Sequence, residues 1–244
     1  MSPSTETRER RELAYELKFL LSPAVADQIR DWVRGRLAPD PHAGGCADDE
    51  YRITSLYFDT PEFATFHRRG SYGRSKFRIR RYGNGEVVFL ERKARARGQL
   101  SKRRSLVPLE DLERLGGSAA DRGWTGCWFH RRLQLRRLDP VCQISYDRAA
   151  RVAMTDNGPI RLTLDMNLRA LPAAGLWFNE RAGDVLLPDR VVLELKFLRE
   201  SPVVFKCLVE EFALNPEPFS KYRLAAASLG RVPVLAPDAA TLSA

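Results

Sequence analysis

The chain has 244 residues, of which 44% are hydrophobic, so it can bury a sizeable core and is not disordered in bulk. Its 40 lysines and arginines outnumber its 31 aspartates and glutamates, which gives a net charge of +9 at pH 7. This excess favours an anionic partner such as nucleic acid, a membrane surface or a phosphate-rich small molecule, although a basic protein without such a partner is the alternative. No apolar run approaches the roughly 20 residues of a spanning helix, and the polar N-terminus lacks the apolar centre of a signal peptide.

Eight segments combine β-branched and aromatic residues with period-two alternation, which predicts strands. In chain order they are 12–21, 51–59, 75–82, 86–95, 100–107, 141–152, 159–168 and 188–198. The sequence Gly83-Asn84-Gly85 predicts a tight hairpin turn between the third and fourth of them.

Helices are predicted between some of these strands. Ser22-Pro23 has the residue types of a helix start, and Val25, Ile29, Val33 and Leu37 then recur every fourth residue. Further helices are expected at 60–69, at 108–137 with a break near Gly116-Gly117, at 202–213 and at 220–229. Residues 38–49 and 169–187 are predicted loops. The domain is expected to span 12–231, between a disordered lead at 1–11 and a loose tail at 232–244.

Charged residues two positions apart recur inside the predicted strands. The pairs and the triplet are Glu16-x-Lys18, Lys76-x-Arg78-x-Arg80, Glu91-x-Lys93 and Glu194-x-Lys196. Residues i and i+2 of a strand point to the same face, so each set lies opposite an apolar face. A solvated strand face would give a similar pattern, but several such strands closing into a barrel would line its interior with cations. That interior would suit a polyphosphate and its divalent metal.

The run Lys102-Arg103-Arg104 allows two orientations, because alternation places either Lys102 with Arg104, or Arg103 alone, inside. The first is favoured. Glu16 and Glu91 are expected to orient neighbouring cations rather than bind metal.

Nine short motifs together resemble the VTC domain, the polyphosphate polymerases of the triphosphate tunnel metalloenzyme superfamily. They are YELKF (15–19), SLYFDT (55–60), KFRIRRY (76–82), FLERK (89–93), SKRR (101–104), SYDR (145–148), RLTLD (161–165), LELKF (193–197) and FSKYR (219–223). Each motif alone is weak evidence, but their order and spacing together are specific. The resemblance extends from about Glu12 to Gly230.

The resemblance implies an α+β fold, an antiparallel β-barrel tunnel of about eight strands with helices packed outside. It also implies phosphate-binding and catalytic roles for basic residues on the tunnel wall, namely Lys18, Arg78, Arg80, Lys93, Arg148, Arg161 and Lys221. Lys102 matches a further basic position, and strand alternation adds Arg104 and Lys196. Glu194 matches the carboxylate that holds a divalent metal, for which Mn²⁺ or Mg²⁺ is expected. Asp165 is predicted to hold Arg161, and Lys221 to lie toward one opening of the tunnel.

One departure from the wider superfamily is that Ala14 stands where many tunnel enzymes have a first glutamate. This favours the polymerase branch, which transfers the γ-phosphate of ATP to a growing polyphosphate chain. Hydrolysis of tripolyphosphate or a nucleoside triphosphate in the same tunnel is the alternative, as is a non-catalytic polyphosphate-binding module. No nucleic-acid partner is expected, since no recognised module appears.

The four cysteines, Cys46, Cys127, Cys142 and Cys207, form no close pair and suggest reduced, mostly buried thiols of a cytoplasmic protein. Any membrane association would then need a separate protein partner.

Overall fold

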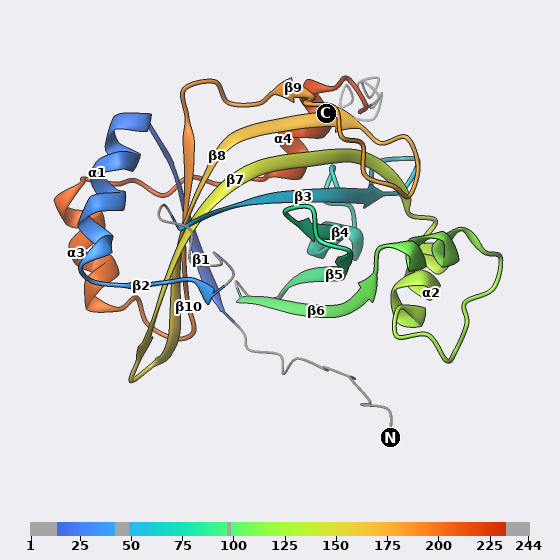
Figure 1. Cartoon of the computed structure of the whole chain (residues 1–244), viewed down its shortest axis with the longest axis horizontal. Coiled ribbons are helices and arrows are strands. Elements are labelled where there is room, and N and C mark those ends of the chain that lie inside the picture. Colours follow the sequence, from blue (N-terminus) through green and yellow to red (C-terminus); the bar gives the residue numbers. More distant parts are fainter. Residues whose placement is uncertain (1–13, 42–48, 97–98, 233–244) are drawn as a thin grey trace, which may run out of the picture.

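A computed structural model of the chain describes residues 14–41, 49–96 and 99–232. Its centre is one antiparallel sheet of ten strands, which curves around an interior space (Figure 1). The strands are β1 (Tyr15–Leu21), β2 (Ala38–Pro39), β3 (Glu50–Asp59), β4 (Ser75–Tyr82), β5 (Val87–Ala96), β6 (Gln99–Pro108), β7 (Asp139–Thr155), β8 (Gly158–Pro172), β9 (Asp184–Val185) and β10 (Val191–Phe197).

The main path of the sheet runs β1-β10-β8-β7-β3-β4-β5-β6, with β2 beside β7 and β9 beside β8. The two ends of this path, β1 and β6, approach each other, but no strand pairing among the described residues joins them. The sheet is therefore a barrel that is not closed by hydrogen bonds. In Figure 1, β3, β7 and β8 arch over one side of the interior while β5 and β6 form the opposite side.

Helices cover the outside of the sheet. α1 (Pro23–Arg34) and α3 (Val203–Glu211) lie together at one end, and α2 (Cys127–Arg136) lies at the other (Figure 1). α4 (Lys221–Ser228) and the short 3-10 helices η2 (Tyr72–Arg74) and η3 (Glu110–Gly116) complete the set. The α1 start is as predicted, because Ser22 Oγ accepts a hydrogen bond from the Val25 backbone N–H.

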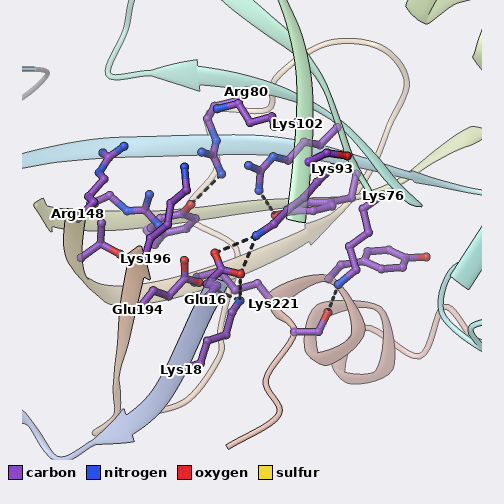
Figure 2. Close-up of a pocket in the computed structure, with 18 residues that line it drawn as sticks. Glu16, Lys18, Lys76, Arg80, Lys93, Lys102, Arg148, Glu194, Lys196 and Lys221 are labelled. Atoms are coloured by element: carbon purple, nitrogen blue, oxygen red, sulfur yellow. Dashed lines mark hydrogen bonds and ion pairs between the residues drawn. The ribbon is translucent and has the colours of Figure 1, made fainter. Parts of the chain in front are cut away.

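The strands have their apolar face outward and their polar face inward, as β10 illustrates. Leu193 and Leu195 are fully buried in the core that α1 and α3 cover, with Ile29 and Phe205 from those helices. Glu194 projects from the other face into the interior (Figure 2). The helices thus supply the hydrophobic core, and the interior of the sheet is free to be charged.

All eight predicted strands are present, and the turn at 83–85 is confirmed by a 3.1 Å hydrogen bond from Gly85 N to Tyr82 O. The two additional strands, β2 and β9, are two-residue pairings inside the predicted loops 38–49 and 169–187. β8 also extends into the second of these loops. The predicted 108–137 helix is divided into η3 and α2. The predicted lead at 1–11 lies outside the described residues, as does the predicted tail beyond residue 232.

The helix predicted at 60–69 is wrong, because this segment forms a series of turns. The buried carboxylate of Asp59 accepts hydrogen bonds from the backbone N–H groups of Thr60, Thr65 and Phe66, at 2.7 to 2.9 Å. These bonds replace helical ones, and Arg68 takes the left-handed conformation with φ 56°.

Candidate functional site

The interior of the sheet contains a cavity of about 180 Å³, and each of its lining side chains carries a polar or charged group. Ten of its lining residues are basic, and they come from β1, β4, β5, β6, β7, β8, β10 and α4 (Figure 2). These are Lys18, Lys76, Arg78, Arg80, Lys93, Lys102, Arg148, Arg161, Lys196 and Lys221. Two carboxylates, Glu16 and Glu194, also line it. A concave site with this excess of cations is suited to a compact polyanion.

Arg148 and Lys221 are held by one buried carboxylate, Asp165. Arg148 donates from Nε and Nη2 to the two Asp165 oxygens at 2.5 and 2.7 Å. Lys221 Nζ lies 2.6 Å from Asp165 Oδ2 and donates at 2.9 Å to Glu194 Oε1. Lys18 donates to the same Glu194 oxygen at 3.0 Å. Side chains from five elements, β1, β7, β8, β10 and α4, are thereby fixed around one point of the cavity wall.

Glu91 does the same for a second group of cations. It is fully buried on β5, receives a 2.6 Å hydrogen bond from Arg78 Nε and forms a 3.0 Å ion pair with Lys102. Arg80 lies 4.0 Å from Glu91 and donates a 3.1 Å hydrogen bond to the Tyr146 hydroxyl. The two guanidinium groups are therefore preorganised, and each retains N–H groups for a phosphate.

Glu16 lies against Lys93, which donates to both of its carboxylate oxygens at 2.8 and 2.9 Å. Lys18 is 3.8 Å from Glu16. Because β1 and β5 are not neighbours in the sheet, the Glu16–Lys93 pair bridges the side on which the barrel is open. The expected roles of Glu16 and Glu91 in orienting cations agree with these contacts.

The electrostatics of the site keep its carboxylates ionised. Desolvation raises the pKa of each, but neighbouring cations outweigh it: Arg78 and Arg80 hold the pKa of Glu91 well below its usual value. Lys18 and Lys221 do the same for Glu194, and Arg148 and Lys221 lower the pKa of Asp165. The carboxylates are nevertheless outnumbered, so the cavity keeps a net positive charge at neutral pH.

Lys76 differs from the other lining cations and was not among the predicted site residues. Its Nζ donates a 2.8 Å hydrogen bond to Ser220 Oγ, and no carboxylate among the described residues forms an ion pair with it. Burial, and then repulsion from Lys18, Lys93 and Arg78, lowers its pKa to about 7. The spacing Lys76-x-Arg78-x-Arg80 contained the signal that could have identified it.

The hydroxyls of Tyr57 and Tyr146, which accept hydrogen bonds from Arg78 and Arg80, were also not among the predicted site groups. Tyr57 is buried, but it lines the cavity and its OH accepts a hydrogen bond from Arg78 Nη1 at 3.1 Å.

Most of the predicted site residues meet in this cavity. They are Lys18, Arg78, Arg80, Lys93, Lys102, Arg148, Arg161, Glu194, Lys196 and Lys221. Arg104 is not among the lining residues; its guanidinium lies 4.7 Å from the centre of the Phe89 ring, so its phosphate-binding role stays a prediction. Arg103 packs over Trp128 on the outer side, which agrees with the favoured of the two predicted orientations.

Two predicted details are wrong. Asp165 does not hold Arg161, whose Nη2 instead forms a 2.6 Å ion pair with Asp40 and a 2.7 Å hydrogen bond to the Tyr51 hydroxyl. Lys221 does not lie at an opening, because it is 7% exposed and forms ion pairs deep in the cavity. Both errors concern partners on distant parts of the chain.

A second cavity, of about 410 Å³, continues from the first. The two share five lining residues: Glu16, Lys18, Lys76, Lys93 and Ser220. Beyond these, the second wall carries the exposed arginines Arg68, Arg74 and Arg95, together with Glu217. The basic interior therefore leads outward on the side of the molecule where β1, β5 and the segment before α4 meet.

The donor set fits a divalent metal that binds together with a phosphate ligand. Within the described part of the chain, no group of three or more histidine, cysteine, aspartate or glutamate residues could hold an ion alone. Glu194 faces the cavity, and both of its ion pairs use Oε1, so Oε2 is the oxygen not engaged by the lysines. Mg²⁺ and Mn²⁺ commonly bind one or two carboxylates and complete their coordination with phosphate oxygens and water.

The fold and this cavity define a tunnel-like domain with a strongly basic interior. The chain belongs to the VTC domain family, whose model matches residues 13–230. No curated protein matches the chain significantly. Among the described residues, none of the helices is long and apolar enough to cross a membrane.

Solved structures support the fold. A Bacillus halodurans protein proposed to be an adenylate cyclase has a TM-score of 0.55 at 15% identity, over 86% of this chain and 95% of that one. A Hippeastrum protein proposed as an adenylyl cyclase, with a dominant triphosphatase activity, has a TM-score of 0.49 at 13% identity, over 89% and 96%. A Pyrococcus horikoshii OT3 protein has a TM-score of 0.49 at 13% identity, over 88% of this chain and 99% of that one. The first likeness shows a shared tunnel fold.

Proposed function

We propose that this protein is a metal-dependent polyphosphate polymerase that transfers the γ-phosphate of ATP to a growing polyphosphate chain. The observation that carries the proposal is the charge of the cavity wall, where ten basic side chains face two carboxylates. Membership in the VTC domain family supports the same reaction class. The continuity of the two cavities adds support, since a product chain needs a way out while a hydrolase needs only a pocket.

The arginines have the geometry to bind and orient the triphosphate. The guanidinium groups of Arg78, Arg80 and Arg148 are fixed by Glu91, Tyr146 and Asp165, as described above. A planar guanidinium donates two parallel hydrogen bonds to phosphate oxygens, so these side chains can align the transferred phosphoryl group. Because phosphoryl transfer depends mainly on alignment and charge neutralisation, this preorganisation is the main contribution expected from the protein.

Two lysines from different elements add positive charge close to the same place. Lys18 and Lys221 both contact Glu194 Oε1, at 3.0 and 2.9 Å, and their remaining N–H groups are available to phosphate oxygens. Negative charge that develops on the leaving diphosphate would be stabilised by these ammonium groups without reorganisation.

Glu194 is the residue proposed to hold the metal. When bound, Mg²⁺ or Mn²⁺ would neutralise charge on the phosphate oxygens and help to align them. The neighbouring lysines keep Glu194 ionised, so its carboxylate is ready to bind a cation at neutral pH.

Product analysis tests the proposal. The protein is incubated with ATP and Mn²⁺ or Mg²⁺, and ADP, polyphosphate and orthophosphate are each quantified by ³¹P NMR. A polymerase releases ADP in proportion to the phosphate found in chains, with little orthophosphate. If orthophosphate accounts for essentially all of the released phosphate, the reaction is a triphosphatase reaction in the same cavity. Tight polyphosphate binding without ATP turnover would identify a non-catalytic binding module.

A further inference from the structure

We propose that the second cavity is a binding subsite for the distal part of a long phosphate chain, with Arg68 and Arg74 as its length-selecting residues. The inference rests on the proposed function for its ligand class, linear polyphosphate, but it concerns residues outside the main cavity. A tripolyphosphate that fills the main cavity would not reach these arginines, whereas a longer chain would continue past Lys76 toward them.

Continuity of the basic surface is the first argument. Lys18, Lys76 and Lys93 line both cavities and form the junction between them. A chain leaving the main cavity at this junction passes from these partly buried lysines to the exposed arginines Arg68 and Arg74. Polyphosphate carries a negative charge on each repeating unit. A series of cations that continues from the main cavity into the second one is therefore complementary to a long chain.

The arginines of the second cavity are available for an anionic ligand. Among the described residues, no carboxylate forms an ion pair with Arg68, Arg74 or Arg95. Elsewhere on this protein exposed arginines do have such partners, as in the pairs Arg34–Asp31 and Arg114–Asp111, both at 2.8 Å. The one carboxylate added by the second cavity is Glu217, whose backbone N–H is bonded to Lys18 O at 2.8 Å.

The segment that carries Arg68 and Arg74 is held in place. Asp59 fixes its first half through three backbone N–H groups, and Arg69 O accepts hydrogen bonds from Tyr72 and Gly73 at its end. Gly73 packs so closely that an added Cβ would lie 2.4 Å from Arg68 O. A rigid segment places both side chains beside the cavity at low entropic cost on binding.

Equilibrium binding of tripolyphosphate and of long-chain polyphosphate, without ATP or metal, tests this subsite. The variant Arg68→Ala/Arg74→Ala should bind the long chain about tenfold more weakly and tripolyphosphate as the wild type does. The matched control is Arg69→Ala/Arg122→Ala, which removes the same charge from two exposed arginines that line neither cavity. This control should bind both ligands normally.

Gly73→Ala provides a second variant that leaves the charge unchanged. The added methyl group must displace the Arg68 backbone, so long-chain binding should again weaken selectively. Equal weakening of both ligands, unchanged long-chain binding in the arginine variant, or an equal effect in the control would each overturn the proposal. Because no turnover is involved, the result is independent of whether the protein polymerises or hydrolyses phosphate chains.

Discussion

Arg148 on β7 and Asp165 on β8 stand opposite each other in the strand register and are joined by two hydrogen bonds of 2.5 and 2.7 Å. Both side chains are buried, and Lys221 shares the same carboxylate. One carboxylate thereby positions two of the cations that face the cavity. The phosphate affinity proposed for the site would thus depend on a residue that does not line the cavity.

Asp165→Asn should destabilise the free protein by about 3 to 5 kcal/mol, because it leaves the buried Arg148 without its counter-charge and removes one of the two carboxylates that pair with Lys221. Urea unfolding measures this loss. Asp147→Asn is a suitable control, since Asp147 pairs with Arg52 in a partly exposed ion pair that should contribute at most about 1 kcal/mol. Added tripolyphosphate should restore part of the stability of Asp165→Asn by supplying negative charge. A stability equal to that of the control variant would contradict the assignment.

Arg78→Ala and Arg80→Ala should each weaken tripolyphosphate binding, because each removes a charged hydrogen-bond donor from the cavity. The expected loss is on the order of 1.5 to 3 kcal/mol for each variant, measured by calorimetry. Arg81→Ala is the neighbouring control, since Arg81 points to the other face and pairs with the exposed Glu180 at 2.9 Å. Unchanged affinity in both test variants would remove these arginines from the phosphate site.

Glu194→Gln should abolish metal-dependent turnover while retaining much of the metal-free affinity for tripolyphosphate. The amide oxygen can still accept hydrogen bonds from Lys18 and Lys221, but it lacks the charge that attracts a divalent ion. Turnover is measured across a Mn²⁺ titration, and binding is measured separately in a chelator. Glu16→Gln is the comparison: Glu16 bonds Lys93 through both oxygens, so the metal dependence should shift less. Wild-type metal dependence in Glu194→Gln would place the ion elsewhere.

Binding of a polyphosphate should take up a proton at Lys76. Its pKa, lowered to about 7 in the free protein, should rise when a phosphate chain stabilises the ammonium form. Below pH 7 the amine is already charged in both states. Above pH 7 binding must include protonation, so affinity should fall with rising pH, by at most about tenfold per pH unit from this residue.

The charged groups that face Lys76 come from several elements: Glu16, Lys18, Arg68, Arg74, Arg78, Lys93, Arg95 and Glu217. Burial also lowers the pKa of Lys93 and of Lys102, so the wild-type profile contains other contributions. Comparison with Lys76→Met isolates the effect: calorimetry at pH 8 in buffers of different ionisation enthalpy should show less proton uptake in this variant. Identical proton uptake in both proteins would show that Lys76 does not titrate on binding.

The strands and their polar faces could be predicted from the sequence because the information is local. Alternation of apolar and charged residues fixes which face of a strand is buried, and this holds for Arg78, Arg80, Glu194 and Lys102 wherever the strand lies in the sheet. The helix caps at Ser22 and Ser220 are equally local, since each depends on a hydroxyl and a backbone N–H three residues later.

Only the tertiary structure decided which charges meet. Lys221 lies in a short helix after the last strand, and nothing near it in sequence reveals that it is buried between Asp165 and Glu194. The pairing of Arg161 with Asp40 depends on a loop that returns to β7. Ion-pair partners are set by distance in space, and a period-two pattern specifies a face but no neighbour.

The position and the pKa of Lys76 show the same difference between what local sequence and tertiary structure determine. The sequence by itself determined that Lys76 shares a strand face with two arginines, and the family motifs indicated that this face lines the interior of a tunnel. Folding then placed Lys76 beside Ser220, where it forms no ion pair with a carboxylate of the described residues. Its lowered pKa follows from burial among other cations, which is a property of the assembled interior and cannot be assigned to any single segment.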